Sequence, residues 1–171
     1  MYYICKVLEK IIEILKIRIK VLYWKIKYGK RIKIGKKIKF RKGFKIEIGK
    51  DGLLEIGNYN FFNNYCSINC LSKIKIGDKN LFGENVKMYD HNHIFNNKQI
   101  DKSKKFSTKN IKIGSNNWIG SNVCILKNGN IGNDNVISAN SVINFNVENN
   151  KVVKKIENYK IEEINYIGDQ L

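Results

Sequence analysis

In the second half of the chain, isoleucine recurs at every sixth position from Ile113 to Ile143. A six-residue period matches neither the α-helical period nor the two-residue alternation of a half-buried strand. It fits a chain that turns a corner in every hexad, so that one apolar residue per hexad points into a shared core. Three such sides close a coil of about 18 residues, and the coils stack at roughly the 4.8 Å spacing of paired strands. The repeat therefore predicts a mainly β protein built as a parallel β-helix.

The same period occurs in the first half of the chain, in two runs separated by a two-residue slip. The first run is Ile56, Phe62, Ile68 and Ile74, and the second is Ile76, Phe82, Met88 and Ile94. Glycine directly follows several of these residues, where it either relieves crowding or supplies a positive φ near a corner. A series of antiparallel hairpins with coincidental spacing is the alternative fold.

The repeat is interrupted once and flanked at both ends. Residues 95–110 break the period and predict an inserted surface loop within a β-helix domain that spans 30–147. Residues 1–29 place apolar residues at i, i+3 and i+4 and predict a basic amphipathic helix, although this pattern weakens over 23–28. Residues 148–171 lose the rhythm and predict a short cap on the last coil.

The positive charge is concentrated at the N-terminal end. Residues 1–50 contain 17 of the 32 Lys and Arg residues and 3 of the 15 Asp and Glu residues, so they carry +14 of the net charge of +17. A solvated basic helix face is one interpretation. Another is peripheral contact of residues 1–45 with an anionic membrane, where each basic residue contributes roughly 1 kcal/mol. Nucleic-acid binding is the weakest, because no recognised module is present and the rest of the chain is nearly neutral.

The length and the apolar pattern indicate where the protein resides. No apolar stretch reaches the roughly 20 residues that span a bilayer, and charged residues interrupt the N-terminal region where a signal peptide would be apolar. The four cysteines include the pair Cys66 and Cys70, but no second pair or nearby histidine completes a zinc site. We therefore expect a cytoplasmic protein with buried free thiols and no metal, at most peripheral on the inner face of the cytoplasmic membrane.

Both histidines of the chain, His91 and His93, lie beside Asp90 just before the interruption. Irregular segments on rigid scaffolds are where sites tend to be built. Histidine can remove a proton from a hydroxyl near neutral pH, and residues two apart on a strand share a side. Two histidines cannot supply the three ligands of a catalytic zinc site within one chain. We therefore expect acid–base chemistry at this position.

Two segments, NWIGSNV over 117–123 and IGNDNVISANSV over 131–142, resemble the hexapeptide-repeat acetyltransferases. The likeness is closest to the branch with galactoside, maltose and Nod-factor acetyltransferases and the O-acetyltransferases of capsule and lipopolysaccharide synthesis. The repeat resemblance covers about residues 30–147. It implies a left-handed parallel β-helix, a homotrimer, and acetyl-CoA lying in a groove between neighbouring coils.

The resemblance also assigns roles to single residues. Asp90-His91 matches the family's Gly-His or Asp-His, which makes His91 the catalytic base. The other implied site residues are acceptor-binding Asn63, His93 and Asp90, and cofactor-binding Trp118, Gly120, Ser121 and Ala139. The sequence departs from the family after residue 143, where the usual proline and Gly-x-Pro-Ala turn are missing. Lys154 or Lys155 is then the candidate for the lysine near the adenine end of the cofactor.

Together these features predict an acetyl-CoA-dependent O-acetyltransferase that acts on a sugar hydroxyl, in the modification of a surface glycan such as capsule or lipopolysaccharide. One alternative is an acetyltransferase for a small molecule such as an amino acid, an amino sugar or an antibiotic. The other is a non-catalytic β-helix scaffold.

Overall fold

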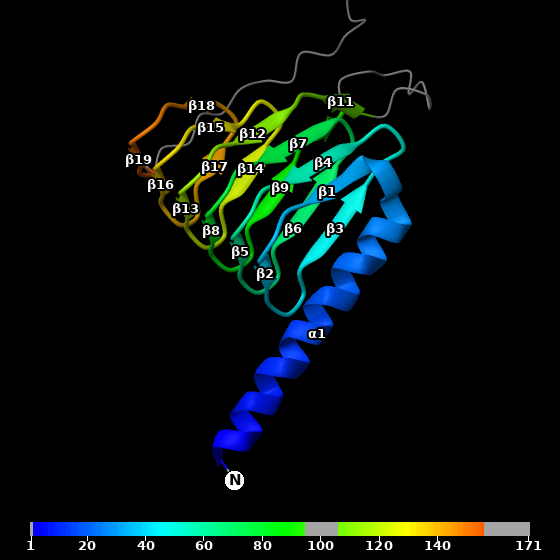
Figure 1. Cartoon of the computed structure of the whole chain (residues 1–171). Helices are drawn as coiled ribbons and strands as arrows, with labels where there is room; N and C mark the ends of the chain where they lie inside the picture. The colour runs from blue at the N-terminus through cyan, green and yellow to red at the C-terminus, as the bar shows by residue number, and fades with distance from the viewer. Residues whose placement is uncertain (1, 95–105, 156–171) are drawn as a thin grey trace, which may run out of the picture.

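A computed structural model describes residues 2–94 and 106–155 of the 171-residue chain. One long helix precedes a prism whose three faces are parallel sheets (Figure 1). Face A contains β1 (Ile32–Ile34), β4 (Leu53–Ile56), β7 (Lys73–Ile76), β12 (Ile111–Ile113), β15 (Asn130–Ile131) and β18 (Asn146–Val147). Face B contains β2 (Lys39–Phe40), β5 (Phe61–Phe62), β8 (Leu81–Phe82), β13 (Trp118–Ile119), β16 (Val136–Ile137) and β19 (Val152–Val153). Face C contains β3 (Lys45–Ile48), β6 (Ser67–Cys70), β9 (Lys87–Tyr89), β14 (Cys124–Leu126) and β17 (Val142–Ile143).

The chain visits the faces in the order A, B, C, and each round is one coil. Coil 1 is β1 to β3, coil 2 is β4 to β6, coil 3 is β7 to β9, coil 4 is β12 to β14, coil 5 is β15 to β17, and coil 6 is β18 and β19. Equivalent strands of successive coils pair in parallel register. The predicted parallel β-helix is therefore confirmed, and the alternative of antiparallel hairpins is wrong.

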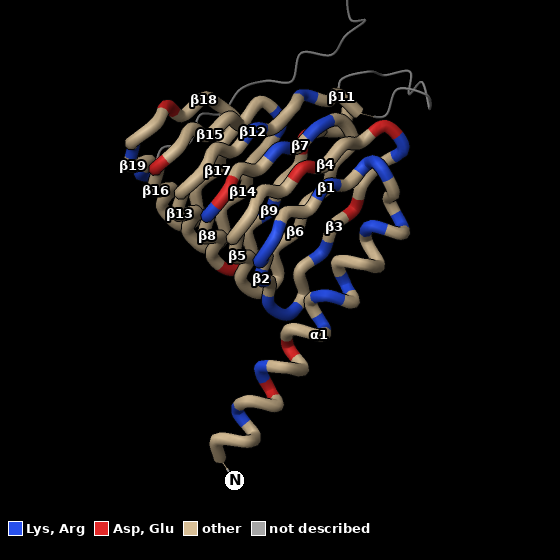
Figure 2. The backbone as a smooth tube through the Cα atoms, viewed as in Figure 1, with Lys and Arg blue, Asp and Glu red and all other residues tan. Residues whose placement is uncertain are grey.

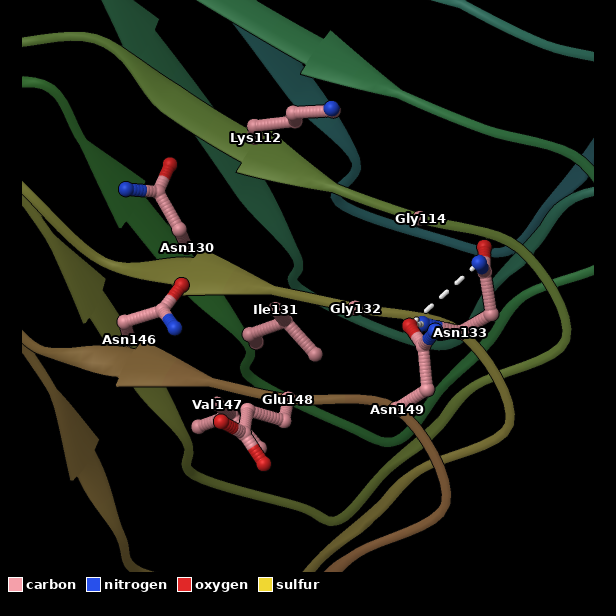
Figure 3. A pocket seen from close by; sticks show the side chains of 10 residues that line it. All are labelled: Lys112, Gly114, Asn130, Ile131, Gly132, Asn133, Asn146, Val147, Glu148 and Asn149. Atoms are coloured by element: carbon pink, nitrogen blue, oxygen red, sulfur yellow. Dashed lines mark hydrogen bonds between the residues drawn. The ribbon is translucent and has the colours of Figure 1, made fainter.

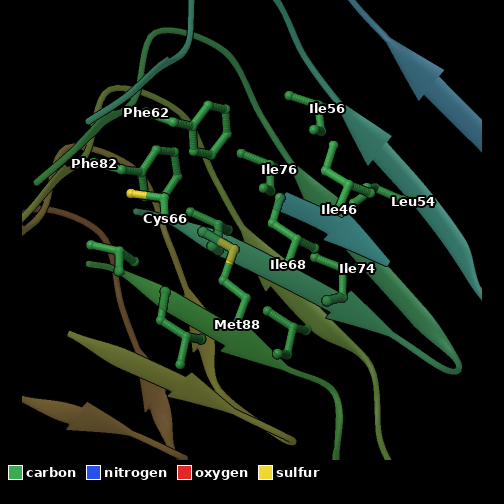
Figure 4. Close-up of a cluster of buried hydrophobic side chains, with 14 of the residues drawn as sticks. Ile46, Leu54, Ile56, Phe62, Cys66, Ile68, Ile74, Ile76, Phe82 and Met88 are labelled. Carbon is green, nitrogen blue, oxygen red and sulfur yellow. The ribbon is translucent and has the colours of Figure 1, made fainter. Parts of the chain in front are cut away.

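The hexad residues fill the interior of the prism. The six isoleucines from Ile113 to Ile143 are at most 2% exposed. Phe44, Phe62 and Phe82 stack along the axis with ring centroids 4.5 and 4.6 Å apart. Figure 4 shows Phe62 and Phe82 among aliphatic side chains such as Ile68 and Ile76. The inward position predicted for Ile94 is wrong, because the chain leaves the prism before this residue and its side chain is 37% exposed.

The glycines that follow hexad residues are required by crowding between coils. A Cβ added to Gly57 would lie 2.6 Å from the carbonyl oxygen of Gly77, and one added to Gly77 would lie 2.7 Å from that of Gly114. The positive φ values at the same corners belong to other residues, such as Lys79 at 58° and Asn116 at 65°. Of the two roles considered for these glycines, close approach is the one observed.

A ladder of buried amides runs inside the corner between faces A and B, formed by Asn60, Asn80, Asn117 and Asn135. The Oδ1 atom of Asn80 accepts hydrogen bonds from the backbone N–H and the Nδ2 of Asn117, both at 2.9 Å. Its own Nδ2 donates to the carbonyl of Gly114 at 2.9 Å. Through its Oδ1, each asparagine thus accepts a hydrogen bond from a backbone N–H in the turn of the next coil.

Helix α1 (Tyr2–Tyr28) covers the open end of coil 1 and is followed by the short helix η1 (Gly29–Arg31). Trp24 and Tyr28 are buried, and the ring of Trp24 lies 5.4 Å from Phe40 and 5.5 Å from Phe44. The expected weakening of the helix over 23–28 is wrong. Apolar residues alternate with lysine there because the helix has two apolar sides in this segment. Trp24 and Tyr28 pack against the prism, whereas Tyr23 and Ile26 are exposed.

The break in the repeat is partly ordered. Strand β10 (His91–His93) pairs antiparallel with β11 (Phe106–Thr108), so the end of the predicted loop over 95–110 is a strand that returns to the prism. Past residue 147, Val152 and Val153 pair with β16 and continue face B, whereas the sequence had placed them in a cap. The remainder of that predicted cap, 156–171, lies outside the described residues. Within the described part, no helix is long and apolar enough to cross a membrane.

Candidate functional site

The first group of predicted site residues lies at the corner where coil 3 leaves face C toward face A. Asp90 directly follows β9, and its carboxylate is fully buried. The backbone N–H of Leu71 donates to Oδ1 at 2.8 Å, and that of Ser72 donates to Oδ2 at 2.7 Å. Both amides belong to the corresponding corner after β6. The preceding coil therefore holds the carboxylate in one orientation.

The same carboxylate orients His91. Nδ1 of His91 lies 3.0 Å from Oδ1 of Asp90, and the imidazole side chain is 15% exposed. An ionised carboxylate only accepts hydrogen bonds, so in the neutral imidazole the proton resides on Nδ1. Nε2 then carries the lone pair. This arrangement can accept a proton from a hydroxyl that approaches the Nε2 side.

The hairpin of β10 and β11 adds aromatic walls to this corner. The ring of Phe106 lies 5.1 Å from His91 and 4.5 Å from His93, so both imidazoles lie on one side of the hairpin, as alternation along a strand predicts. Tyr89 packs edge-on against His91 with ring centroids 6.1 Å apart. Sequence reasoning missed Phe106, because it lies in the segment that breaks the repeat and no periodic signal marks it.

Hydrogen bonds tie the hairpin to the prism on both sides of the corner. The backbone N–H of Lys109 donates to the carbonyl of Asp90 at 2.9 Å. Nζ of Lys127, at the same corner of coil 4, donates to Oγ of Ser107 at 2.6 Å. The hairpin base is therefore fixed by the coil below and by the coil above.

The second group of predicted site residues lies around face B. Trp118 begins β13 and is 58% exposed on the outer surface of that face. Gly120 and Ser121 follow at the corner between faces B and C, and Ala139 occupies the same corner one coil later. A Cβ on Gly120 would lie 2.6 Å from the backbone nitrogen of Ala139, so the two coils are in close contact there.

Asn63 lies at this B–C corner as well, but on coil 2. Its backbone N–H donates to the carbonyl of Phe82, and its Oδ1 accepts from the N–H of Asn64 at 2.8 Å. In a three-sided cross-section the C–A corner of His91 lies opposite face B (Figure 1). Within one chain, the structure therefore brings Asp90, His91 and His93 together, and separately Trp118, Gly120, Ser121 and Ala139, but it does not join the two groups.

Solved structures with the same fold identify the family. A maltose O-acetyltransferase from Clostridium difficile 630 is 30% identical, with a TM-score of 0.64 over 75% of this chain and 72% of that one. The chain belongs to the hexapeptide-repeat acetyltransferases. No protein-family profile matches it.

Two further members extend the comparison. A hexapeptide-repeat-containing acetyltransferase from Vibrio cholerae is 30% identical, with a TM-score of 0.59 over 70% of this chain and 66% of that one. Its complex with acetyl coenzyme A is matched over 63% of its length. A galactoside acetyltransferase in complex with coenzyme A is 27% identical, with a TM-score of 0.57 over 74% of this chain and 65% of that one. This hexapeptide-repeat acetyltransferase thus spans slightly less than two thirds of these relatives.

Two of the four thiols of this family member are buried in the prism. Cys66 and Cys70 are buried, Cys124 is half-buried, and Cys5 on α1 is exposed, so the expectation of buried thiols is wrong for Cys5. Burial raises the pKa of the Cys66 and Cys124 thiols. Burial, followed by the negative charge of Asp90, raises the pKa of Cys70 to about 12. In the described residues, no three His, Cys, Asp or Glu side chains gather as a metal site would require.

A hollow of about 610 Å³ lies on face A over coils 4 to 6 (Figure 3). Lys112, Asn130 and Asn146 occupy paired positions along its floor. At its edge, Asn149 accepts a hydrogen bond from the N–H of Asn133 at 2.7 Å. None of the predicted site residues lines this hollow. The candidate site of this family member therefore remains the C–A corner around His91.

Proposed function

We propose that the chain transfers an acetyl group from acetyl-CoA to a sugar hydroxyl, with His91 as the general base. The observation that carries this proposal is the Asp90–His91 pair, in which a buried carboxylate holds Nδ1 so that the lone pair on Nε2 can accept a proton. Family membership supplies the reaction class. The pair supplies the group that this reaction needs on the acceptor side.

The proposed reaction proceeds by direct attack. Nε2 of His91 removes the hydroxyl proton as the oxygen attacks the thioester carbonyl. The tetrahedral intermediate then collapses, the C–S bond breaks, and the proton passes from His91 to the departing thiolate. The products are the O-acetyl ester and CoA. Backbone N–H groups near the carbonyl would stabilise the oxyanion, a role in which one donor contributes roughly 3 kcal/mol.

Acetyl-CoA would bind along the strip formed by Trp118, Gly120, Ser121 and Ala139. Three features of the strip support this assignment. The indole is exposed, the coils approach closely at Gly120, and the residues stack over two successive coils. Lys154 or Lys155, just beyond β19, would meet the adenine end of the cofactor.

A homotrimer would reunite the two groups of site residues. Trp118 lies on face B, opposite the C–A corner of His91, and Gly120, Ser121 and Ala139 lie at the other edge of face C. A site that uses both groups therefore requires residues from two copies. A closed threefold ring makes the same contact at each of its three interfaces. The exposed apolar residues Trp118 and Val142 on the outer faces are suited to such an interface.

The acceptor would be a sugar of a surface glycan such as capsule or lipopolysaccharide, with His93 and, from a neighbouring copy, Asn63 on the acceptor side. The carboxylate of Asp90 is fully buried and would act only by orienting His91. The solved relatives named for maltose and galactoside support a sugar over an amino acid or an antibiotic. The proposal places the protein at the inner face of the cytoplasmic membrane, with the basic residues 1–45 toward anionic lipids.

The test is an assay of acetyl transfer from acetyl-CoA to a panel of maltose, galactosides, amino sugars and isolated surface glycans. The measured quantity is the rate at which CoA thiol is released. His91→Ala should lower kcat by roughly 10²–10⁴-fold. The matched control His93→Ala should mainly raise the KM of the acceptor. Near-normal turnover by His91→Ala would refute the assignment, and a chain that binds no acetyl-CoA would be a scaffold instead.

A further inference from the structure

The outward side of α1 carries an uninterrupted apolar stripe. Its members are Ile4, Leu8, Ile11, Leu15, Ile19, Leu22 and Ile26, each between 47% and 75% exposed. Their spacing of four, three and four residues repeats every eleven, close to the natural period of a straight α-helix, so the stripe stays on one side for its whole length. Helix α1 supplies more than half of the large hydrophobic side chains that the described part of the chain exposes.

Packing against the prism does not account for this stripe. The apolar residues that pack against the prism are Ile17, Val21, Trp24 and Tyr28, which form a separate side of the helix. Lys20 and Lys27 also contact the prism, through Phe44 and Glu47. At 3.6 residues per turn, the two sides face nearly opposite directions. Residues 2–16 are all exposed and project beyond coil 1 (Figure 1). The stripe therefore points away from the protein at the end of the prism that α1 covers.

The charges of α1 indicate what covers the stripe. The helix contains seven Lys and Arg residues and two glutamates. Arg18 and Lys25 border the stripe along one edge, whereas Glu9, Glu13 and most of the lysines lie on the far side of the helix. A second copy packed stripe to stripe would place these basic residues together without acidic partners. Anionic lipid headgroups supply the missing negative charge.

The neighbouring coil has the same charge character. Residues 30–45 contain nine Lys and Arg residues and no acidic residue. Figure 2 shows many basic residues along α1 and on coil 1 beside it. An apolar stripe bordered by basic residues and continuous with a basic surface is the composition of a helix that lies in a membrane interface.

We propose that α1 lies in the plane of an anionic membrane, with the stripe inserted at the boundary between headgroups and acyl chains. Coil 1 would then face the membrane. One helix diameter of about 10 Å and two coil spacings of about 4.8 Å place the corner of His91 roughly 20 Å above the stripe. The consequence for the substrate, which rests on the proposed function, is an acceptor sugar attached to a lipid and presented just beyond the headgroups.

The proposal is tested by flotation of the full chain with phosphatidylcholine vesicles, with and without phosphatidylserine. The stripe variant is Ile11→Ser with Leu15→Ser, in the projecting half that does not contact the prism. The control is Glu9→Ser with Glu13→Ser, which places the same residue type on the opposite side. The native chain and the control should float with anionic vesicles at low salt, and the stripe variant should bind roughly tenfold or more weakly.

Three results would overturn the proposal. The first is that the native chain fails to float with anionic vesicles. The second is that the stripe variant floats as well as the native chain, which would mean that charge alone causes adsorption. The third is that no vesicle binds and sedimentation velocity shows self-association that the stripe variant loses, which would mean that a second copy covers the stripe. The proposed function is separable, because His91→Ala should abolish transfer but keep flotation. The stripe variant should keep transfer to a free soluble sugar.

Discussion

The carboxylate of Asp90 lies 3.0 Å from Nδ1 of His91 and is held from behind by the amides of Leu71 and Ser72. The orientation of the histidine therefore depends on the preceding coil as well as on its own strand. The C–A corner of coil 2, which contains Leu71 and Ser72, thus supports the candidate base on coil 3. This relationship leads to the first prediction.

Asp90→Asn should lower kcat by roughly tenfold to a thousandfold with little change in the KM for acetyl-CoA. The amide oxygen can still accept one backbone hydrogen bond, but its NH2 group cannot hold the same tautomer of His91. The measurement is steady-state kinetics of CoA release. In a His91→Ala background the same substitution should have no further effect on kcat, because positioning matters only if the base is present. An equal loss in both backgrounds would contradict the positioning role.

Trp118→Ala should weaken acetyl-CoA binding and raise its KM, because the exposed indole is the proposed wall of the cofactor strip. Leu81→Ala is the matched control, since Leu81 pairs with Trp118 on face B and is similarly exposed. Isothermal titration with acetyl-CoA distinguishes the two variants. If the native chain and Trp118→Ala bind acetyl-CoA with equal affinity, the indole is not part of the cofactor site.

Asn80→Ala should lower the free energy of unfolding by roughly 2–5 kcal/mol, because it leaves the Asn117 N–H and the Gly114 carbonyl buried without partners. The control is Asn146→Ala, an exposed asparagine on face A that should change the free energy by at most about 0.5 kcal/mol. Urea unfolding followed by circular dichroism measures both. A loss below about 1 kcal/mol for Asn80→Ala would show that water replaces the ladder.

Thiol chemistry provides a fourth prediction. The pKa of Cys70 is raised from 9.0 to about 12, so a folded chain keeps this proton at pH values where an unfolded chain releases it. The folded state should therefore lose stability as the pH rises from about 9 toward 12, and Cys70→Ala should make that loss smaller. The measurement is the free energy of unfolding as a function of pH.

Thiol labelling provides a check on the same cysteines. Exposed Cys5 should react with a disulfide reagent at once, whereas Cys66 and Cys70 should react only after unfolding. Rapid labelling of Cys70 in the native protein would contradict its burial beside Asp90. It would also remove the basis for the expected loss of stability at high pH.

The repeat made the fold predictable because each hexad isoleucine independently indicates a side chain that points into the core of the prism. From Ile113 to Ile143, every position predicted to be inward is buried. The prediction was wrong where the chain left the prism. Ile94 keeps the six-residue spacing but follows Asp90 into the hairpin, and spacing alone cannot show that a coil has ended. The return strand at Phe106 was missed for the same reason.

The candidate site was predictable only in part. The sequence singled out His91 and Asp90, because two histidines at the one break of a regular scaffold are conspicuous. It gave no indication that Leu71 and Ser72, one coil earlier, hold the carboxylate. Contacts between coils join residues that are 18 and 19 positions apart, and no pattern in the chain marks which of these partners meet.

The sequence by itself determined the β-helix, the amphipathic helix and the pair of candidate histidines, because each follows from local periodicity or from rare residues at a break. The choice of His91 over His93 came from the family resemblance at Asp90-His91. Only the tertiary structure decided how they are arranged. It placed His91 and Trp118 on opposite sides of the prism and turned the second apolar side of α1 outward. The physical reason is that the number of residues per coil sets the face on which each side chain emerges, and packing of Trp24 on coil 1 sets which side of the helix stays exposed.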